Sequence, residues 1–352
     1  MLQAMYSRSP ASVFKHLETL SRVGSGKFMD QYYVGYGHKS IGDCGTITLF
    51  VEGVSMLVAK AIQDWMLYSG QESSTRYLDF SEQPFVNAIG TAGSQSWLDE
   101  WRALYLKALP RIRVHLKQQF PIQEGEDEKV YTKAINARSF DIARSLLPAG
   151  AATNLSWHTN LRQTADKLVY LRNHPLQEVR EVAEAMERLL MCVFPNSFSG
   201  KRHEMSEEYV NWWMHTGYYL SARTADTCLR WHNGIDMNLL TEYRDVIAKR
   251  PERTELPKQI GECGTIRFEA PLDFGSFRDL QRQRAVVQRM PLLTTNIGFE
   301  PWYLVSMPDD LADEVQSALF EFQRYIGEYA LSPEEKATAQ YLTTMGYLVP
   351  CS

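Results

Sequence analysis

The chain has 352 residues, 44% of them hydrophobic and 22% charged, with a formal net charge of −5. This length allows about two domains of roughly 150 residues each, and the apolar fraction is sufficient for a sizeable core. The mildly acidic balance gives no electrostatic support to a general nucleic-acid binder or to a protein that binds anionic membranes.

The N-terminus shows no basic region followed by a hydrophobic run, and the longest apolar stretch, residues 49–62, is interrupted by Glu52 and Lys60. We therefore expect a cytoplasmic protein without a membrane partner. Scattered cysteines with neither CxxC nor Cys/His ligand spacing predict no disulfide framework and no metal site. The five are Cys44, Cys192, Cys228, Cys263 and Cys351.

Residues 1–200 form the first predicted domain. A helix over residues 12–23 leads to a turn at Tyr36–Ser40, and residues 45–52 alternate polar and apolar side chains as a strand does. Helical spacing of apolar residues then predicts helices over 54–66, 97–119, 130–146, 161–171 and 178–192.

Turn-forming residues 194–201 are interpreted as a linker to a second predicted domain, residues 206–352. This domain begins with helices. Its later elements are a charged loop over 249–257, a strand over 265–270, and helices over 274–289, 310–329 and 333–342. The predicted fold class is therefore mixed α/β (α+β), with two tandem domains that each combine a small sheet with packed helices.

One heptapeptide occurs twice: Ile41–Ile47 (IGDCGTI) returns as Ile260–Ile266 (IGECGTI), which indicates an internal duplication. After the first copy comes Gln71–Tyr77, rich in anion donors. After the second comes Arg282-Gln283-Arg284, a dense cationic triplet. Because neither copy has both, we predict one composite phosphate-binding site built from the two domains.

The segment Glu72–Tyr77 combines hydroxyls with a guanidinium, which suits a nucleoside monophosphate, although a solvated polar loop has a similar composition. Arg278, Arg282 and Arg289 would share one wide face of the helix predicted over 274–289. Unpaired cations on one face favour an anionic ligand. The alternative is an exposed basic face whose arginines pair with carboxylates elsewhere.

Motifs of the first domain follow one another in an order that carries more information than any single motif. They are Gly37-His38-Lys39-Ser40, Glu72–Tyr77, Arg144 before Leu147-Pro148, Asn160-Leu161-Arg162 and Gln177–Arg180. Over most of residues 1–190 this series resembles the flavin-dependent thymidylate synthases, the class that uses no catalytic cysteine. The resemblance implies two thymidylate-synthase-complementing-like domains in tandem.

The resemblance also implies roles for individual residues. Nucleotide binding falls to Glu72, Ser74, Arg76, Arg144 and Arg282, and flavin binding to Ser40, Asn160, Arg162, Arg282, Gln283 and Arg284. The candidates for a catalytic role are Arg144 and Arg172, the latter one residue past its expected place. No metal is implied.

The sequence departs from the family pattern in both domains. Cys44 stands where a histidine is usual, and the place of the family's Arg-His-Arg triplet falls within residues 63–66, which contain neither arginine nor histidine. In the second domain, Arg282-Gln283-Arg284 resembles that triplet with glutamine replacing histidine. There Met290–Leu293 replaces the Ser-x-Arg-Tyr end, and Leu348-Val349-Pro350 resembles the earlier Leu-Leu-Pro.

The family assembles each active site from several subunits of a homotetramer, so the resemblance implies a homodimer of two-domain chains that mimics the tetramer. The implied enzyme is a methyltransferase that converts dUMP to dTMP with FAD, NADPH and methylenetetrahydrofolate. Two alternatives stay open. One is a catalytically inactive nucleotide-binding, flavin-binding or structural relative, and the other is a flavin-dependent enzyme that modifies another pyrimidine nucleotide.

Overall fold

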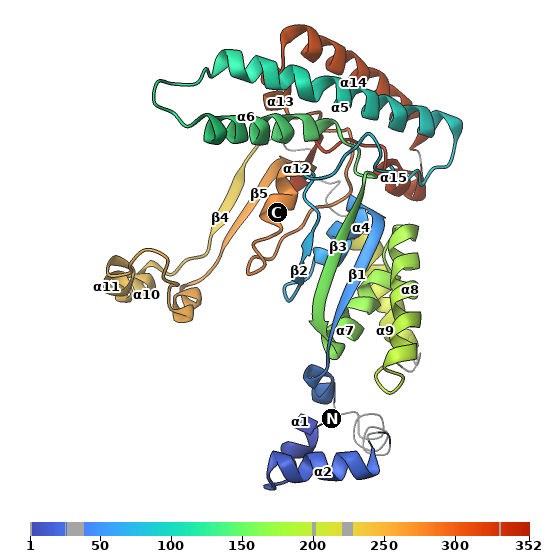
Figure 1. Cartoon of the computed structure of the whole chain (residues 1–352), viewed down its shortest axis with the longest axis vertical. Helices are drawn as coiled ribbons and strands as arrows, with labels where there is room; N and C mark the ends of the chain where they lie inside the picture. Colours follow the sequence, from blue (N-terminus) through green and yellow to red (C-terminus); the bar gives the residue numbers. More distant parts are fainter. Residues whose placement is uncertain (1, 25, 27–38, 199–201, 220–227, 331) are drawn as a thin grey trace.

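A computed structural model describes residues 2–24, 26, 39–198, 202–219, 228–330 and 332–352, and Figure 1 shows the chain. The mixed α/β class is confirmed, with two three-stranded sheets and helices packed around them. The first half of the chain contains α1 (Leu2–Tyr6), α2 (Val13–Val23), η2 (Lys39–Cys44), β1 (Thr46–Ser55), α4 (Met56–Gln63), β2 (Ser69–Glu72), α5 (Ala92–Gln119), α6 (Glu128–Ala143), η3 (Arg144–Leu146), β3 (Ala152–Asn160), α7 (Leu161–Arg172) and α8 (Gln177–Val193).

The second half of the chain carries a shorter set of elements. They are α9 (Glu204–Tyr219), β4 (Arg230–Asn233), α10 (Met237–Glu242), α11 (Arg244–Ala248), η5 (Lys258–Cys263), β5 (Ile266–Asp273), α12 (Phe274–Leu280), α13 (Pro301–Val305), α14 (Asp309–Tyr329), α15 (Pro333–Ala339) and β6 (Leu348–Cys351). Part of the predicted linker, residues 199–201, lies outside the described residues. Within the described ranges, no helix combines the length and apolar character needed to cross a bilayer.

The first sheet has the antiparallel order β1-β3-β2, and its register places Ser55 opposite Ala152. Ser55 ends β1 and starts α4, because its hydroxyl accepts from the backbone N–H of Val58. The Glu178 carboxylate of α8 in turn accepts from the Ser55 N–H and hydroxyl, at 2.9 and 2.6 Å. These bonds fix α4 between the sheet and α8.

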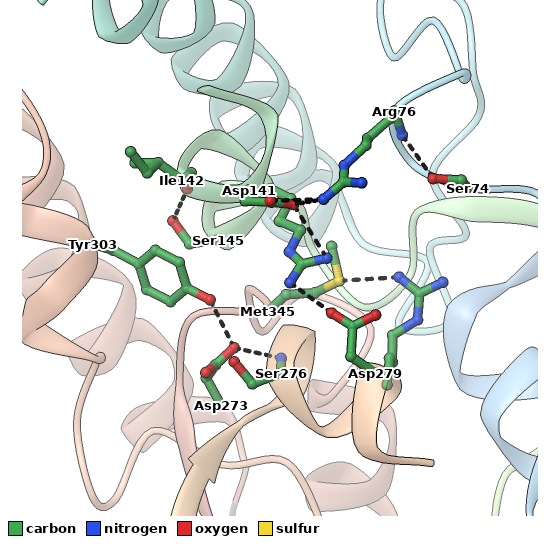
Figure 2. Close-up of polar contacts among 12 residues, drawn as sticks. Ser74, Arg76, Asp141, Ile142, Ser145, Asp273, Ser276, Asp279, Tyr303 and Met345 are labelled. Atoms are coloured by element: carbon green, nitrogen blue, oxygen red, sulfur yellow. Dashed lines mark hydrogen bonds and ion pairs between the residues drawn. The ribbon is translucent and has the colours of Figure 1, made fainter. Parts of the chain in front are cut away.

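The second sheet has the antiparallel order β4-β5-β6, so β5 is its central strand, whereas β1, which begins at the end of the first heptapeptide as β5 does at the end of the second, is an edge strand. Asp273 ends β5 opposite Leu348 and starts α12, where its carboxylate accepts from the N–H of Ser276 and the hydroxyl of Tyr303, both at 2.9 Å. Figure 2 shows this cap. A polar residue at the junction of strand and helix therefore sets the start of α12 as it sets the start of α4.

A helical layer lies at one end of both sheets, where α5, α6 and α14 run across the molecule in Figure 1. Aromatic packing joins its two halves. The ring of Phe322 on α14 lies 5.2 Å from the rings of both Trp97 and Trp101 on α5. Trp101 and Phe322 are fully buried, so this layer belongs to one core shared by the two halves of the chain.

Backbone hydrogen bonds between the two halves are arranged symmetrically. The N–H of Ala149 donates to the carbonyl of Thr343, and the N–H of Met345 donates to the carbonyl of Leu147, both at 2.9 Å. An approximate two-fold axis thus relates the two segments. Any antiparallel bridge has such a local axis, so the duplication and the boundary near residue 200 both stay predictions.

The strand registers correct one expectation. Leu342–Thr344, and not Leu348–Pro350, takes the place of Leu146–Pro148. The reason is that β3 begins at Ala152 opposite Ser55 and β6 begins at Leu348 opposite Asp273, each four residues after Pro148 and Thr344 respectively. Leu348–Pro350 instead lies in β6, next to β5. The three-residue Leu-Val-Pro match was too short to tell the segment before β6 from β6 itself.

The helix predicted over 274–289 is also corrected, because α12 ends at Leu280. Gln281 follows it, and its buried side-chain amide donates to the carbonyl of Lys60 on α4 at 3.1 Å. The expected helical face of Arg278, Arg282 and Arg289 therefore does not exist. Of the three, only Arg278 is helical; Arg282 lies in a turn, and Arg289 lies in a segment without regular structure.

Candidate functional site

A polar pocket of about 760 Å³ lies between the two halves of the chain, a volume suited to a small organic ligand. The first half contributes β2 with the loop that follows it and η3, and the second half contributes α12 and the turn after it. The lining residues are Gln63, Gly70, Gln71, Glu72, Ser73, Ser74, Thr75, Arg76, Tyr77, Leu78, Arg144, Arg278, Asp279, Arg282 and Arg284. The structure thus brings the two segments of the predicted composite site to one cavity, while phosphate binding there stays a prediction.

The loop after β2 is held against β3 by its backbone. The N–H of Ser73 donates to the carbonyl of Asn154 at 2.8 Å. Gly70 in β2 is packed so closely that a Cβ atom there would lie 1.9 Å from the carbonyl oxygen of Ser156. The hydroxyl-rich loop therefore starts from a fixed edge of the first sheet, which positions Ser74 and Arg76 at the pocket.

Arg76 is directed by a carboxylate of α6. Its Nη2 lies 2.7 Å from both oxygens of Asp141, a contact drawn in Figure 2, and its backbone N–H lies 3.4 Å from the hydroxyl of Ser74. The Arg76 side chain is 45% exposed, so this pair is open to solvent. A ligand oxygen can therefore reach the guanidinium beside Asp141.

Arg144 begins η3 directly after α6 and is mostly buried, with 18% of its side chain exposed. Its Nη2 lies 3.1 Å from Asp279 of α12, and its Nη1 lies 3.7 Å from Asp141. Burial alone would lower the pKa of the Arg144 guanidinium, but Asp279 and Asp141 together hold that pKa above its ordinary value. Arg144 is thus a fixed cation between the two halves.

Arg278 joins the two halves through a second ion pair. Its Nη2 lies 2.5 Å from Oε1 of Glu72, and its Nη1 lies 3.3 Å from the sulfur of Met56. The other carboxylate oxygen of Glu72 accepts from the amide of Gln63 at 2.7 Å. Glu72 therefore forms part of the pocket wall through contacts with both halves of the chain, which its expected role in nucleotide binding did not include.

Both arginines of the cationic triplet, Arg282 and Arg284, line the pocket. Arg282 lies 3.5 Å from Asp279 and is 69% exposed. The guanidinium of Arg284 lies 4.9 Å from the centre of the Tyr68 ring, a cation–π distance. Gln283 does not line the pocket, and its backbone carbonyl accepts from the Gln288 side chain.

The other predicted flavin contacts lie at the far end of the first sheet from α4. Asn160 starts α7, where its side chain accepts from the N–H of Gln163 at 2.8 Å. Arg162 Nε lies 2.9 Å from Asp43, and Ser40 lies in η2 next to that aspartate. The structure does not bring these three residues into the pocket, and Gly37-His38 lies outside the described residues.

Arg172, the second catalytic candidate, lies elsewhere. It contacts Glu207 of α9 and Glu187 of α8, and only 12% of its side chain is exposed. Asn173 also donates to Glu207, at 2.6 Å. The structure does not place Arg172 beside Arg144, and its contacts are those of a residue that fastens α9 to α7 and α8.

Other groups occupy the region of residues 63–66, where the family has its Arg-His-Arg triplet. The buried ammonium of Lys167 donates to the carbonyl of Asp64 at 2.7 Å and lies 5.5 Å from the Trp65 ring. Burial lowers the pKa of Lys167 to about 8. A smaller cavity of about 160 Å³ extends from this segment to the turn after α12. Gln63 and Arg284 line both cavities.

Three pocket groups were absent from the sequence-based assignment. The sequence indicates Arg278 only as part of a basic helical face, without an assigned role in binding. Asp279, in the lining, and Asp141, which contacts two lining arginines, carry no motif. Their role depends on the ion pairs that form when the two halves meet.

Comparison with known proteins places the first half of the chain in a family. The family model described as thymidylate synthase complementing protein matches residues 3–196. The UPF0159 protein of Chlamydia muridarum is 25% identical over 89% of this chain and 69% of its own length. The UPF0159 protein of Thermoplasma acidophilum is 24% identical over 99% of this chain and 84% of its own length. Since the match spans more than half of its residues, including β2, η3 and the loop that carries Ser74 and Arg76, the chain belongs to the thymidylate synthase complementing protein family.

Proposed function

We propose that the chain is a flavin-dependent thymidylate synthase-like enzyme that converts dUMP to dTMP at the pocket between its two halves. The observation that supports this most is the meeting of Ser74, Arg76 and Arg144 with Arg278 and Arg282 in one cavity. Membership of the family supplies the reaction class. A cytoplasmic location is part of the same proposal.

The charges of the pocket suit a monophosphate. Five arginines line it, against the carboxylates of Glu72 and Asp279 in the lining and of Asp141, which contacts Arg76 and Arg144. Five positive and three negative charges leave a formal surplus of two, close to the charge of a phosphate monoester at neutral pH. In this proposal Arg76 and Arg144 hold the nucleotide, and Ser74 donates a hydrogen bond to its phosphate.

The pocket fits the flavin only in part. Arg282 and Arg284 line it and could hold FAD phosphates, whereas Ser40, Asn160 and Arg162 lie outside it. When bound, reduced FAD would supply the hydride that completes the methyl group, with NADPH and methylenetetrahydrofolate as co-substrates. The residues of this chain would bind and orient the nucleotide and exclude water from it.

A homodimer would complete the flavin site. Since Ser40, Asn160 and Arg162 lie on another surface, we propose that a second copy presents them to the pocket, as expected for a two-domain relative of a tetramer. Light scattering at micromolar concentration tests this step. A monomer that binds both FAD and dUMP stoichiometrically would contradict it.

The function is tested by spectroscopy and turnover. Protein purified or reconstituted with FAD should show flavin absorbance, and with NADPH, methylenetetrahydrofolate and dUMP it should form dTMP. Arg144→Ala should abolish turnover, while the control Arg188→Ala on the exposed face of α8 should not. The proposal would be contradicted if Arg144→Ala turned over like the Arg188→Ala control, or if FAD caused no flavin spectral change.

A second candidate is a nucleotide-binding relative without catalysis. It is favoured by the uncharged segment Trp65-Met66 and the buried Lys167 contact in place of the family's Arg-His-Arg. Such a protein would bind dUMP but neither acquire flavin nor form dTMP, even with every co-substrate present. Replacing dUMP by other pyrimidine nucleotides in the same assay tests the third reading, modification of another base.

A further inference from the structure

Among the carboxylates of the pocket, Asp279 has an unusual position, because its two oxygens face two different arginines. Oδ2 lies 3.1 Å from Nη2 of Arg144, and Oδ1 lies 3.5 Å from Nη2 of Arg282. The nonbridging oxygens of a phosphate bridge arginines in the same way. Asp279 is itself part of the pocket lining, so its carboxylate lies in the volume open to a ligand.

The contacts of Asp279 are longer than the two closest ion pairs of this site, Arg76–Asp141 and Arg278–Glu72. Charge-assisted pairs between arginine and carboxylate are usually about 2.7–2.9 Å long. The pair of Arg76 with Asp141 measures 2.7 Å, whereas both contacts of Asp279 exceed 3.0 Å. Replacing these long contacts by an anion loses less interaction energy than replacing a short ion pair would.

The two acidic residues of the pocket lining, Asp279 and Glu72, also differ in how deeply their side chains are buried. The Glu72 side chain is 14% exposed and pairs with the mostly buried Arg278, so it belongs to the framework between the repeats. The Asp279 side chain is 50% exposed, and that of Arg282 is 69% exposed. An exposed ion pair contributes little to stability, and its carboxylate can rotate into water without opening a cavity.

We propose that Asp279 is a built-in competitor for the anionic group of the ligand: it occupies Arg144 and Arg282 in the free protein and gives them up only to a more highly charged anion. A phosphate monoester carries about −1.5 to −2 at neutral pH, against −1 for a carboxylate. The exchange therefore favours phosphate monoesters over singly charged anions, and it lowers the affinity of the pocket for anions in general. Asp279 is a specificity-determining residue of the pocket, and this inference rests on the proposed function for the identity of the nucleotide.

The test is the binding of dUMP, deoxyuridine and inorganic phosphate, measured by isothermal titration calorimetry on the full chain. Asp279→Asn keeps the shape of the side chain and removes its charge, and Asp313→Asn on the exposed face of α14 makes the same charge change outside the pocket. We expect Asp279→Asn to bind dUMP and phosphate roughly tenfold more tightly, because one negative charge leaves the site. The affinity of Asp279→Asn for deoxyuridine should equal that of the wild type. The affinities of Asp313→Asn for dUMP and phosphate should also equal those of the wild type.

The outcomes are distinct. Unchanged or weaker dUMP and phosphate binding by Asp279→Asn would overturn the inference, and so would an equal gain in Asp313→Asn. If no form of the protein binds dUMP but Asp279→Asn binds phosphate more tightly, the role of Asp279 holds and the proposed function fails. Tighter dUMP binding together with dTMP formation supports both.

Discussion

Arg278 and Glu72 form an ion pair between the two halves of the chain, with Nη2 of the arginine 2.5 Å from Oε1 of the glutamate. Their side chains are only 15% and 14% exposed. Replacing one residue of such a buried ion pair is strongly destabilising, because the other charge is then left buried without a partner.

This geometry predicts strong coupling between the two positions. Arg278→Met and Glu72→Gln should each lower the free energy of unfolding by about 3 kcal/mol, and the double variant should lose less than the sum. Urea unfolding of the wild type, the single variants and the double variant measures the coupling. The exposed pair Arg267–Glu269 is the matched control, for which about 0.5 kcal/mol or less is expected. Additive losses at Arg278 and Glu72 would mean that the pair does not hold the halves together.

Nucleotide affinity should depend on both halves of the chain. Arg76→Ala and Arg282→Ala each remove a guanidinium from the pocket and should weaken dUMP or FAD binding by about 1.5–3 kcal/mol. Because both would contact one bound assembly, the double variant should deviate from additivity by roughly 0.5–3 kcal/mol. Calorimetry on the four proteins measures this, with Arg267→Ala as an exposed control. Small additive effects would show that the pocket does not bind nucleotide through both repeats.

The sequence predicted long periodic elements well and short or tertiary ones poorly. Helices α2, α7 and α14 match their predicted ranges closely, because apolar residues recur at helical spacing along them. The four-residue strand β2, Ser69–Glu72, was missed. It has no alternating pattern, and its position is set by pairing with Leu155–His158 of β3, a strand that was also missed.

Local motifs were enough to predict which segments line the pocket, but not the contacts that depend on the fold. The loop of Ser74 and Arg76 and the triplet after α12 were both expected at one site, since each carries a dense local signal. The end of α12 was not predicted, because the bond from Gln281 to Lys60 joins residues far apart in sequence. The same is true of Asp279, whose contact with Arg144 exists only once the halves pack.

Arg172 should prove structural. Its mostly buried contacts with Glu207 and Glu187 predict that Arg172→Ala lowers the free energy of unfolding by about 3 kcal/mol while leaving dUMP affinity unchanged. Arg188→Ala is the matched control on α8, with 70% of its side chain exposed and an expected loss of at most about 0.5 kcal/mol. Urea unfolding and calorimetry measure the two quantities separately. A stable Arg172→Ala protein with lost nucleotide binding would restore the catalytic assignment.

His174 should make the protein sensitive to mild acid. It is buried beyond the end of α7 and its Nδ1 accepts from the backbone N–H of Leu176 at 3.1 Å, which requires an unprotonated nitrogen. Burial, and then the positive charges of Lys60, Lys167 and Arg180, lower the pKa of His174 well below its ordinary value. Below a pH of about 6.5 the unfolded chain therefore binds a proton that the folded protein does not.

The sign of the effect follows from this difference in bound protons. Stability contributed by neutral His174 is fully present above about pH 6.5 and is lost as the pH falls, by up to about 1.4 kcal/mol per pH unit. His174→Asn keeps an acceptor for the Leu176 N–H but cannot be protonated, so its unfolding free energy should fall less between pH 6.5 and 5. Urea unfolding at several pH values compares the two proteins. Equal slopes would show that other groups cause the acid sensitivity, because only the slope, and not the stability at neutral pH, reports on the titration of this imidazole.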